Sequence, residues 1–293
     1  MAATSVALRG AIRHEVSWWD RLKQPFFYAI LIGWAILSIA PFYLSVVFSL
    51  KPVQNIYDKP LFWPQPFTLD NYAKIITQFE YFPQWLLNST IVAVFLCLVR
   101  TLFCAMGGYA FARMKFPGKN LLFTAMLVSM MIPGQVTIIT NFLIIGPRVF
   151  HLIDNLWAVI LPGITTAFGV FMMTQFFKSI PKDLEEAAYI DGADRFTVFF
   201  RLILPLSQTS LITLALFTFQ GEWNAFMWPL IVLRTPTNFT LPLGLQWFKG
   251  EYYSLYSIIL AGSLFNALPI IIIFFLFQRF FIQSIATTGL KGV

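Results

Sequence analysis

Charge, histidine and cysteine are all scarce in this sequence. Of its 293 residues only 11% are Asp, Glu, Lys or Arg, and it contains two histidines and two cysteines. Hydrophobic residues make up 58%. A soluble domain of this length could not bury so much apolar surface, and so few charges would not keep it dispersed, which excludes that class. The composition indicates an all-α integral membrane protein.

The same scarcity leaves little material for catalysis or metal binding. His14 and His151 are isolated, and Cys97 and Cys104 lie about 10 Å apart along one predicted helix, too far for a disulfide. No set of His, Cys, Asp and Glu has metal-ligand spacing, and no Ser/His/Asp combination is available. The phosphate-binding pattern GxxxxGK[ST] does not occur, and no dense Lys/Arg run favours nucleic acid. We expect no enzyme activity, no cofactor and no nucleic-acid partner for this chain.

Long apolar runs dominate instead. Crossing a hydrocarbon core about 30 Å thick takes about 20 residues, and six windows are long enough. They cover 26–50, 86–111, 121–145, 155–177, 204–232 and 255–280. The sequence therefore predicts six transmembrane helices in a membrane domain of 26–285, with an N-terminal segment of 1–25 and a tail of 286–293.

The basic residues predict the orientation of these helices. With the N-terminus inside, 13 of the 20 Lys and Arg residues fall in inner segments and six in outer ones, while Arg100 lies within a span. Cytoplasmic loops carry the excess of Lys and Arg, and every loop here is short enough for that rule. We expect both termini, and the inner loop of about 178–203, to be cytoplasmic.

That inner loop holds an unusual concentration of acids. Five of the thirteen acidic residues lie within twelve positions: Asp183, Glu185, Glu186, Asp191 and Asp194. The helix dipole favours negative charge in the first turn of a helix. In a membrane protein, such a cluster marks a place where the chain meets water, or a partner in water.

Local signals predict a compact helix-turn-helix in this loop. Ser179 and Pro181 are typical of a helix start, and Gly192 of a helix end with positive φ. Asp194 is placed to cap a second helix, from Arg195 to Leu202. This shape suits docking into a groove, although a capped and solvated surface loop explains the same signals.

The spacing of these residues resembles a known motif. Glu186-Ala187-Ala188, then Gly192, then Leu202 and Leu204-Pro205 resemble the coupling motif of binding-protein-dependent ABC importer permeases, with Leu202 at the usual Ile position. The resemblance covers nearly the whole chain and points to the MalG-like carbohydrate branch. Further stretches that carry it are Phe67–Tyr72, Leu87–Thr90, Gly108–Arg113, Phe116–Lys119, Trp223-Asn224 and the ending from Gln278 to Gly292.

The resemblance implies a type I ABC importer transmembrane architecture and a set of partners. These are a homologous second permease subunit, two ATP-binding subunits that hold ATP and Mg, an extracytoplasmic solute-binding protein, membrane lipid and a sugar substrate. It implies a prokaryotic cytoplasmic membrane. The coupling residues it implies are Glu185, Glu186, Ala187, Ala188, Asp191, Gly192, Leu202 and Pro205. Glu186 would face a basic residue of the ATPase, and Gly289–Val293 would reach towards the ATPase dimer.

Polar residues within spans are the candidates for a translocation path, because placing them in lipid is costly. Arg100 either lines the path or pairs with a neighbouring helix, or it merely caps carbonyls or snorkels. Glu222 and Asn224 are expected near the outer end of the fifth span, at the mouth of the path or simply in water. Asn88 and Asn266 are weaker candidates, because hydrogen bonds between helices explain them equally well.

Three alternatives to a sugar importer permease stay open at the level of sequence. The first is an ABC permease for another solute. The second is a secondary transporter, which would show inverted repeats and carboxylates in the membrane, whereas Glu222 is the only acid near a span interior. The third is a membrane scaffold, which gives no reason for the spaced motif.

Overall fold

The structure is a computed structural model and describes residues 18–77, 79–251 and 255–289; this part of the chain contains helices and no strand. The α-helices are α1 Trp18–Ser49, α2 Asp70–Thr77, α3 Phe82–Arg113, α4 Lys119–Ser129, α5 Gly134–Leu143, α6 Leu156–Ile160, α7 Ala167–Ser179, α8 Asp183–Ile190, α9 Arg195–Thr197, α10 Leu204–Leu206, α11 Gln208–Trp223, α12 Met227–Val232, α13 Leu241–Glu251 and α14 Tyr256–Gly289. Short 3-10 or π segments lie between several of them: η1 Val53–Asn55, η2 Ile144–Arg148, η3 Leu161–Gly163, η4 Val198–Ile203 and η5 Pro236–Asn238.

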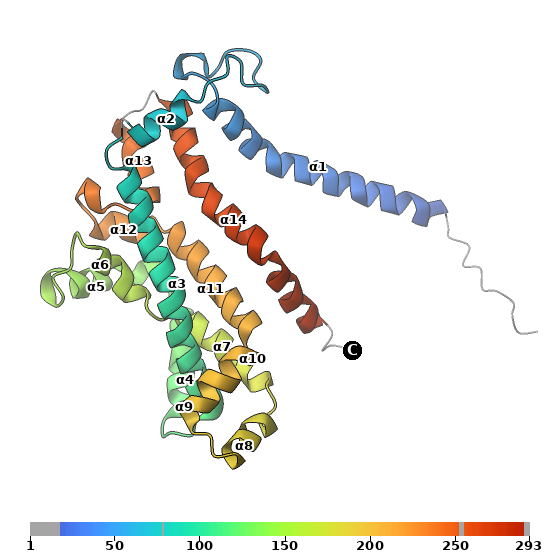
Figure 1. Cartoon of the computed structure of the whole chain (residues 1–293), viewed down its shortest axis with the longest axis vertical. Helices are drawn as coiled ribbons and strands as arrows, with labels where there is room; N and C mark the ends of the chain where they lie inside the picture. Colours follow the sequence, from blue (N-terminus) through green and yellow to red (C-terminus); the bar gives the residue numbers. More distant parts are fainter. Residues whose placement is uncertain (1–17, 78, 252–254, 290–293) are drawn as a thin grey trace, which may run out of the picture.

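The helix α3 is the central element of the bundle, packing against both α7 and α11, while α14 packs against α11 (Figure 1). A side chain at Gly108 of α3 would bring its Cβ within 2.6 Å of the Cβ of Met173 on α7. Small residues at such positions allow membrane helices to approach backbone to backbone. This close packing makes α3 and α7 one unit.

Four helices are long and apolar enough to cross a membrane: Gln24–Ser49, Phe82–Arg113, Leu156–Ser179 and Tyr256–Gln278. Two bent pairs pass the same test together: Lys119–Ser129 with Gly134–Gly146, bent by 104°, and Arg195–Leu206 with Gln208–Trp223, bent by 79°. The described chain therefore has four to six candidate membrane spans.

Two of the predicted windows, 121–145 and 204–232, are sharply bent and do not form single straight helices. Pro133, which has no N–H to donate, precedes α5 at the first break. In the second window the chain bends at Ser207 and again after Trp223. There the backbone and side-chain nitrogens of Asn224 both donate to the carbonyl of Gln220, which ends α11. The helix α12 is a separate short piece.

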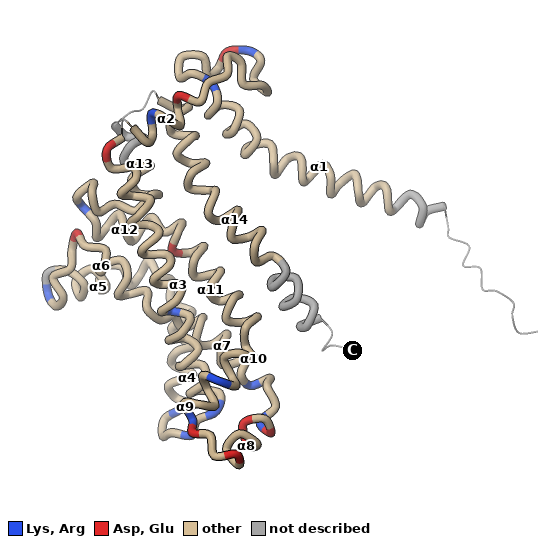
Figure 2. Tube along the Cα trace, in the orientation of Figure 1, with Lys and Arg blue, Asp and Glu red and all other residues tan. Residues whose placement is uncertain are grey.

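The buried side chains form two clusters along the bundle. The larger one includes Trp85 and Trp223, and the smaller one, towards α8, includes Met173 and Phe177. Figure 2 shows charged residues gathered around α8 and α9, with few along the middle of the bundle. By contrast α1 is largely bare: only 6% of its apolar window is buried, and Trp34 is 70% exposed.

Candidate functional site

The acidic cluster folds as the short helix α8, and its end is built as the sequence predicts. Gly192 has φ +84°, and its N–H donates to the carbonyl of Tyr189 while the N–H of Ala193 donates to that of Ala188. This pair of bonds closes a helix when the residue after it adopts the left-handed conformation. The start differs from the prediction. Ser179 is the last residue of α7, where its hydroxyl donates to the carbonyl of Phe176 and caps nothing in α8.

The second helix of the pair is also present. The carboxylate of Asp194 accepts a hydrogen bond from the N–H of Thr197 at 2.9 Å and caps α9. Hydrogen bonds from Thr197 lower the pKa of Asp194. The helical run continues from α9 through η4 and α10 to Leu206, beyond the predicted end at Leu202, and then bends at Ser207 into α11.

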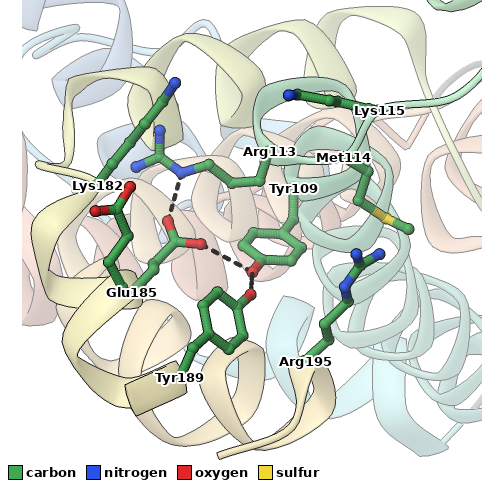
Figure 3. Close-up of a pocket in the computed structure, with 9 residues that line it drawn as sticks. Tyr109, Arg113, Met114, Lys115, Lys182, Glu185, Tyr189 and Arg195 are labelled. Atoms are coloured by element: carbon green, nitrogen blue, oxygen red, sulfur yellow. Dashed lines mark hydrogen bonds and ion pairs between the residues drawn. The ribbon is translucent and has the colours of Figure 1, made fainter.

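Glu185 lies on the inner side of α8 and joins it to α3. The residue is 5% exposed, and its carboxylate pairs with the guanidinium of Arg113 and accepts a hydrogen bond from the hydroxyl of Tyr109 at 3.0 Å (Figure 3). Arg113 also donates to the carbonyl of Ile180 at 2.6 Å. An ion pair with this little solvent access is held by geometry as well as by charge. The helix α8 is therefore fixed to the end of α3.

The other motif residues face outward or lie in the connection to α11. Glu186, Ala187, Asp191 and Gly192 are exposed, and Ala188 is half-buried. Leu202 is half-buried against the smaller cluster, and Pro205 is exposed in α10. The exposed part of α8 thus offers the carboxylates of Asp183 and Glu186, and Glu186 lies beside small residues that let another surface approach the backbone.

Of the candidates for a translocation path, Arg100 and Glu222 come together. A guanidinium nitrogen of Arg100 lies 2.6 Å from a carboxylate oxygen of Glu222, and the same side chain donates to the carbonyl of Gly163. The pair and the bond to Gly163 join α3, α11 and η3. Arg100 lies partway along α3, whereas Glu222 lies at the end of α11. It is the last residue but one of that helix, and the chain turns after Trp223, so the place of Glu222 relative to the mouth of a path stays a prediction.

The three asparagine candidates occupy different surroundings. Asn88 is 2% exposed and donates to the carbonyls of Thr237 and Phe239, holding the η5 turn against α3. The side-chain oxygen of Asn266 is buried and has no hydrogen-bond partner among the described residues. Asn224 is exposed at the end of α11. Among the described residues, no hydrogen bond joins any of these three side chains to Arg100, although the backbone carbonyl of Asn266 accepts from the indole of Trp223, beside Glu222.

One polar site escaped the sequence analysis. Asp154, with φ +64°, accepts hydrogen bonds from the backbone N–H groups of Arg234 and Thr235 and from the Thr235 hydroxyl. Burial raises the pKa of this carboxyl, but these hydrogen bonds outweigh it and bring the pKa down to about 2. The residues that meet here are some 80 positions apart in the chain. A solitary acid between two apolar windows was the sole signal in the sequence.

Neither a metal centre nor the predicted tail contact can be located. Among the described residues, no three His, Cys, Asp or Glu side chains come together. The predicted role of Gly289–Val293 falls on a segment of which residues 290–293 lie outside the described residues.

Comparisons with known proteins show the family of this chain. Residues 102–286 match the family model described as "Binding-protein-dependent transport system inner membrane component". The arabinooligosaccharides transport system permease protein AraQ of Bacillus subtilis is 34% identical over 276 residues, which cover 93% of this chain and 96% of that protein. The AraQ protein of Halalkalibacterium halodurans is 35% identical over 261 residues, 88% of this chain and 93% of that protein.

Two solved structures share the fold. A chain of a bacterial ABC transporter involved in the import of the acidic polysaccharide alginate matches with a TM-score of 0.80 at 20% identity, over 89% of this chain and 97% of that chain. A structure of bacterial alginate ABC transporter in complex with alginate pentasaccharide-bound periplasmic protein matches with a TM-score of 0.63 at 17% identity, over 88% and 94%. With the family model and the AraQ relatives aligned over most of its length, the chain belongs to the binding-protein-dependent transport system inner membrane component family, a family of ABC importer permeases.

Proposed function

We propose that this chain is the pore-forming permease subunit of an ATP-driven importer of a sugar or oligosaccharide, and that α8 is its coupling helix. The observation that carries the proposal is the construction of α8: Glu186 is exposed while Glu185 is tied to Arg113 of α3. The similarity to the AraQ arabinooligosaccharide permeases favours a carbohydrate substrate.

The architecture that we propose is the six-span type I importer arrangement. Each bent pair counts as one span, which gives six within 26–285, with both termini, the segment 1–25 and the tail 286–293 on the cytoplasmic side. The basic residues of the loop 178–203 support that orientation. The membrane is then the cytoplasmic membrane of a prokaryote.

In this mechanism, ATPase closure pushes α8 as a rigid body. The bond of Glu185 to Arg113 carries the displacement to α3, and the continuous path through η4 and α10 carries it to α11. Because Arg100 and Glu222 join α3 to α11 at a third place, the two helices would move together. Such rigid-body motion of packed helices is a common basis of switching between outward and inward access.

The proposed partners follow from this role. Two ATPase subunits bind ATP and Mg and receive α8, a homologous second permease completes the pore, and an extracytoplasmic solute-binding protein delivers the substrate. The alginate transporter determined with its periplasmic protein supports the last of these. The residues proposed for the path itself are Asn88, Arg100, Glu222, Asn224 and Asn266, of which Arg100 and Glu222 act as a pair.

Two alternatives are less favoured. An ABC permease for another solute would use the same coupling helix, and the solute-binding protein would decide between the two. A secondary transporter needs a carboxylate free to bind a coupling ion. Glu222 is instead held by Arg100, which argues against that role.

Charge reversal on α8 tests the proposal. Glu186→Lys and Gly192→Asp are expected to abolish uptake by the assembled importer while the chain still inserts and assembles with its second permease. Asp183→Lys reverses a charge on the same helix outside the motif and is the matched control, with uptake largely retained. Uptake unchanged in both motif variants would contradict the coupling role. Co-purification of the ATPase and screening of sugars on the solute-binding protein then identify the substrate.

A further inference from the structure

A cationic cavity of about 390 Å³ opens between the end of α3 and the coupling helix. Its lining has four cations against two carboxylates, and one pair of these, Arg113 with Glu185, neutralises itself. Lys115, Lys182 and Arg195 remain around the opening, and none of them forms an ion pair with another described residue. In Figure 3 Lys115 and Lys182 lie on one side of this cavity and Arg195 on another. Glu186 adds one carboxylate to the same lining, so that three cations stand against one anion and the cavity keeps a positive net charge that favours an anionic group.

An apolar groove of about 170 Å³ adjoins the cavity and shares three residues with it: Tyr109, Met114 and Arg195. The rest of its lining is Met106, Phe196 and Phe199. Met106 is 44% exposed and Phe196 is 71% exposed, so the groove is accessible. A soluble anion such as phosphate would have no use for this apolar extension, whereas an amphiphile would fill both parts.

The two parts are ordered along α3. Met106 precedes Arg113 by two turns, about 10 Å along the helix, and Met114 and Lys115 follow where the helix ends. Apolar lining towards the interior of the span and cations at its end match the sequence of acyl chain and headgroup in one leaflet. We propose that this composite site binds one anionic phospholipid, with its phosphate among Lys115, Lys182 and Arg195 and an acyl chain against Met106 and Phe196.

This inference rests on the proposed function in one respect: α8 lies on the cytoplasmic side, which places the lipid in the cytoplasmic leaflet. Binding itself requires neither transport nor ATP. Since Lys182 immediately precedes α8, a lipid held here would bear on the coupling helix from its membrane side. The experiment therefore measures lipid retention by the full chain, and its failure is distinct from a failure to transport.

The full-length chain is equilibrated with equal amounts of palmitoyl-oleoyl phosphatidylglycerol and phosphatidylcholine and is then purified in detergent. Native mass spectrometry measures the lipid that it retains. The wild type is expected to retain the phosphatidylglycerol preferentially. Lys115→Gln, Lys182→Gln and Arg195→Gln are each expected to lower its retention by about fivefold, the effect of about one cation near an anionic lipid. The control K59Q/K74Q/R148Q removes three cations elsewhere and should leave retention unchanged.

A second variant, M106S/F196S, tests the apolar half with all cations in place. It should weaken phosphatidylglycerol retention, and millimolar inorganic phosphate should not displace the lipid from the wild type. Equal retention in the wild type and the three Gln variants overturns the proposal. So does displacement by inorganic phosphate with no effect of M106S/F196S, which indicates a soluble anion. Loss of the lipid whenever the ATPase assembles assigns the cavity to an acidic surface of that partner and also overturns it.

Discussion

At the scale of single residues, Glu185 and Glu186 are neighbours with opposite roles. Glu185→Gln leaves Arg113 buried without its counter-ion, a change that costs about 3–5 kcal/mol in folded proteins. We expect a clearly lower thermal unfolding midpoint for the purified chain. Glu186→Gln, on the exposed side, should change the free energy of unfolding by no more than about 0.5 kcal/mol. Equal effects in the two variants would show that the tie to α3 adds nothing to stability.

The Arg100–Glu222 pair calls for a double-mutant cycle. Arg100→Gln leaves the carboxylate of Glu222 without a counter-charge, and Glu222→Gln leaves the guanidinium of Arg100 without one. The double variant has two neutral amides instead. Contacting charges typically show interaction free energies of about 0.5–3 kcal/mol. We therefore expect the double variant to be more stable than the sum of the two single effects predicts, measured as resistance of the purified chain to unfolding. Strict additivity would mean that the pair contributes no coupling between α3 and α11.

The carboxyl of Asp154 makes a prediction for pH. Its pKa of about 2 in the folded chain lies below the ordinary value of 3.8, so ionisation favours the folded loop. This contribution is complete above about pH 4 and is lost as the pH falls through about 2. Hydrogen exchange at the amides of Arg234 and Thr235 should stay slow at pH 4, and Asp154→Asn should speed it at neutral pH. Exchange that already accelerates between about pH 6 and 5 would contradict this.

At the scale of elements, two glycines test the effect of backbone conformation at positions where a side chain would meet no neighbour. A Cβ would meet nothing within 4 Å at either Gly192 or Gly221, but only Gly192 has a positive φ. Gly192→Ala should destabilise the end of α8 by about 1 kcal/mol, because the left-handed conformation is costly for a side chain. Gly221→Ala, within α11, should instead stabilise by about 0.5–1 kcal/mol. Thermal unfolding of both variants decides, and shifts of the same sign would refute the assignment of the helix end.

The C-terminal end of α8 and the start of α9 were predictable because their signals are local. Gly192 and Asp194 act on atoms a few residues away, so their types and order suffice. Ser179 misled because a serine hydroxyl can accept from an N–H ahead of it or donate to a carbonyl behind it, and here it donates backward to Phe176 in α7. The windows 121–145 and 204–232 misled for another reason. The mean hydropathy of a window indicates whether a segment can enter lipid, but it gives no sign of a bend at Pro133 or Ser207.

Across the whole molecule, the pairs that define the site join distant parts of the chain. Arg100 and Glu222 are separated by 122 positions, and Arg113 and Glu185 by 72. Because charges are scarce within the spans, Arg100 and Glu222 could be picked as candidates, and the motif pointed to Glu185. The spacing of residues in a single sequence does not predict which of these charges form pairs. The burial of Glu185, which separates it from Glu186 in function, is a tertiary property and became visible only once α8 was placed against α3.

At the scale of the whole chain, we predict that the helix α1 spans the membrane. From Gln24 to Ser49 it carries no charged residue and is almost unburied, and a helix of that kind needs lipid or a neighbouring helix around it. A nitroxide is attached through Leu37→Cys, or in a second variant through Lys59→Cys, after Cys97 and Cys104 are replaced by Ser. In nanodiscs the label at 37 should relax with lipid-dissolved oxygen and be shielded from a water-soluble nickel reagent, while the label at 59 should show the reverse. If the nickel reagent reaches both labels equally, α1 does not span the membrane and the six-span arrangement is wrong.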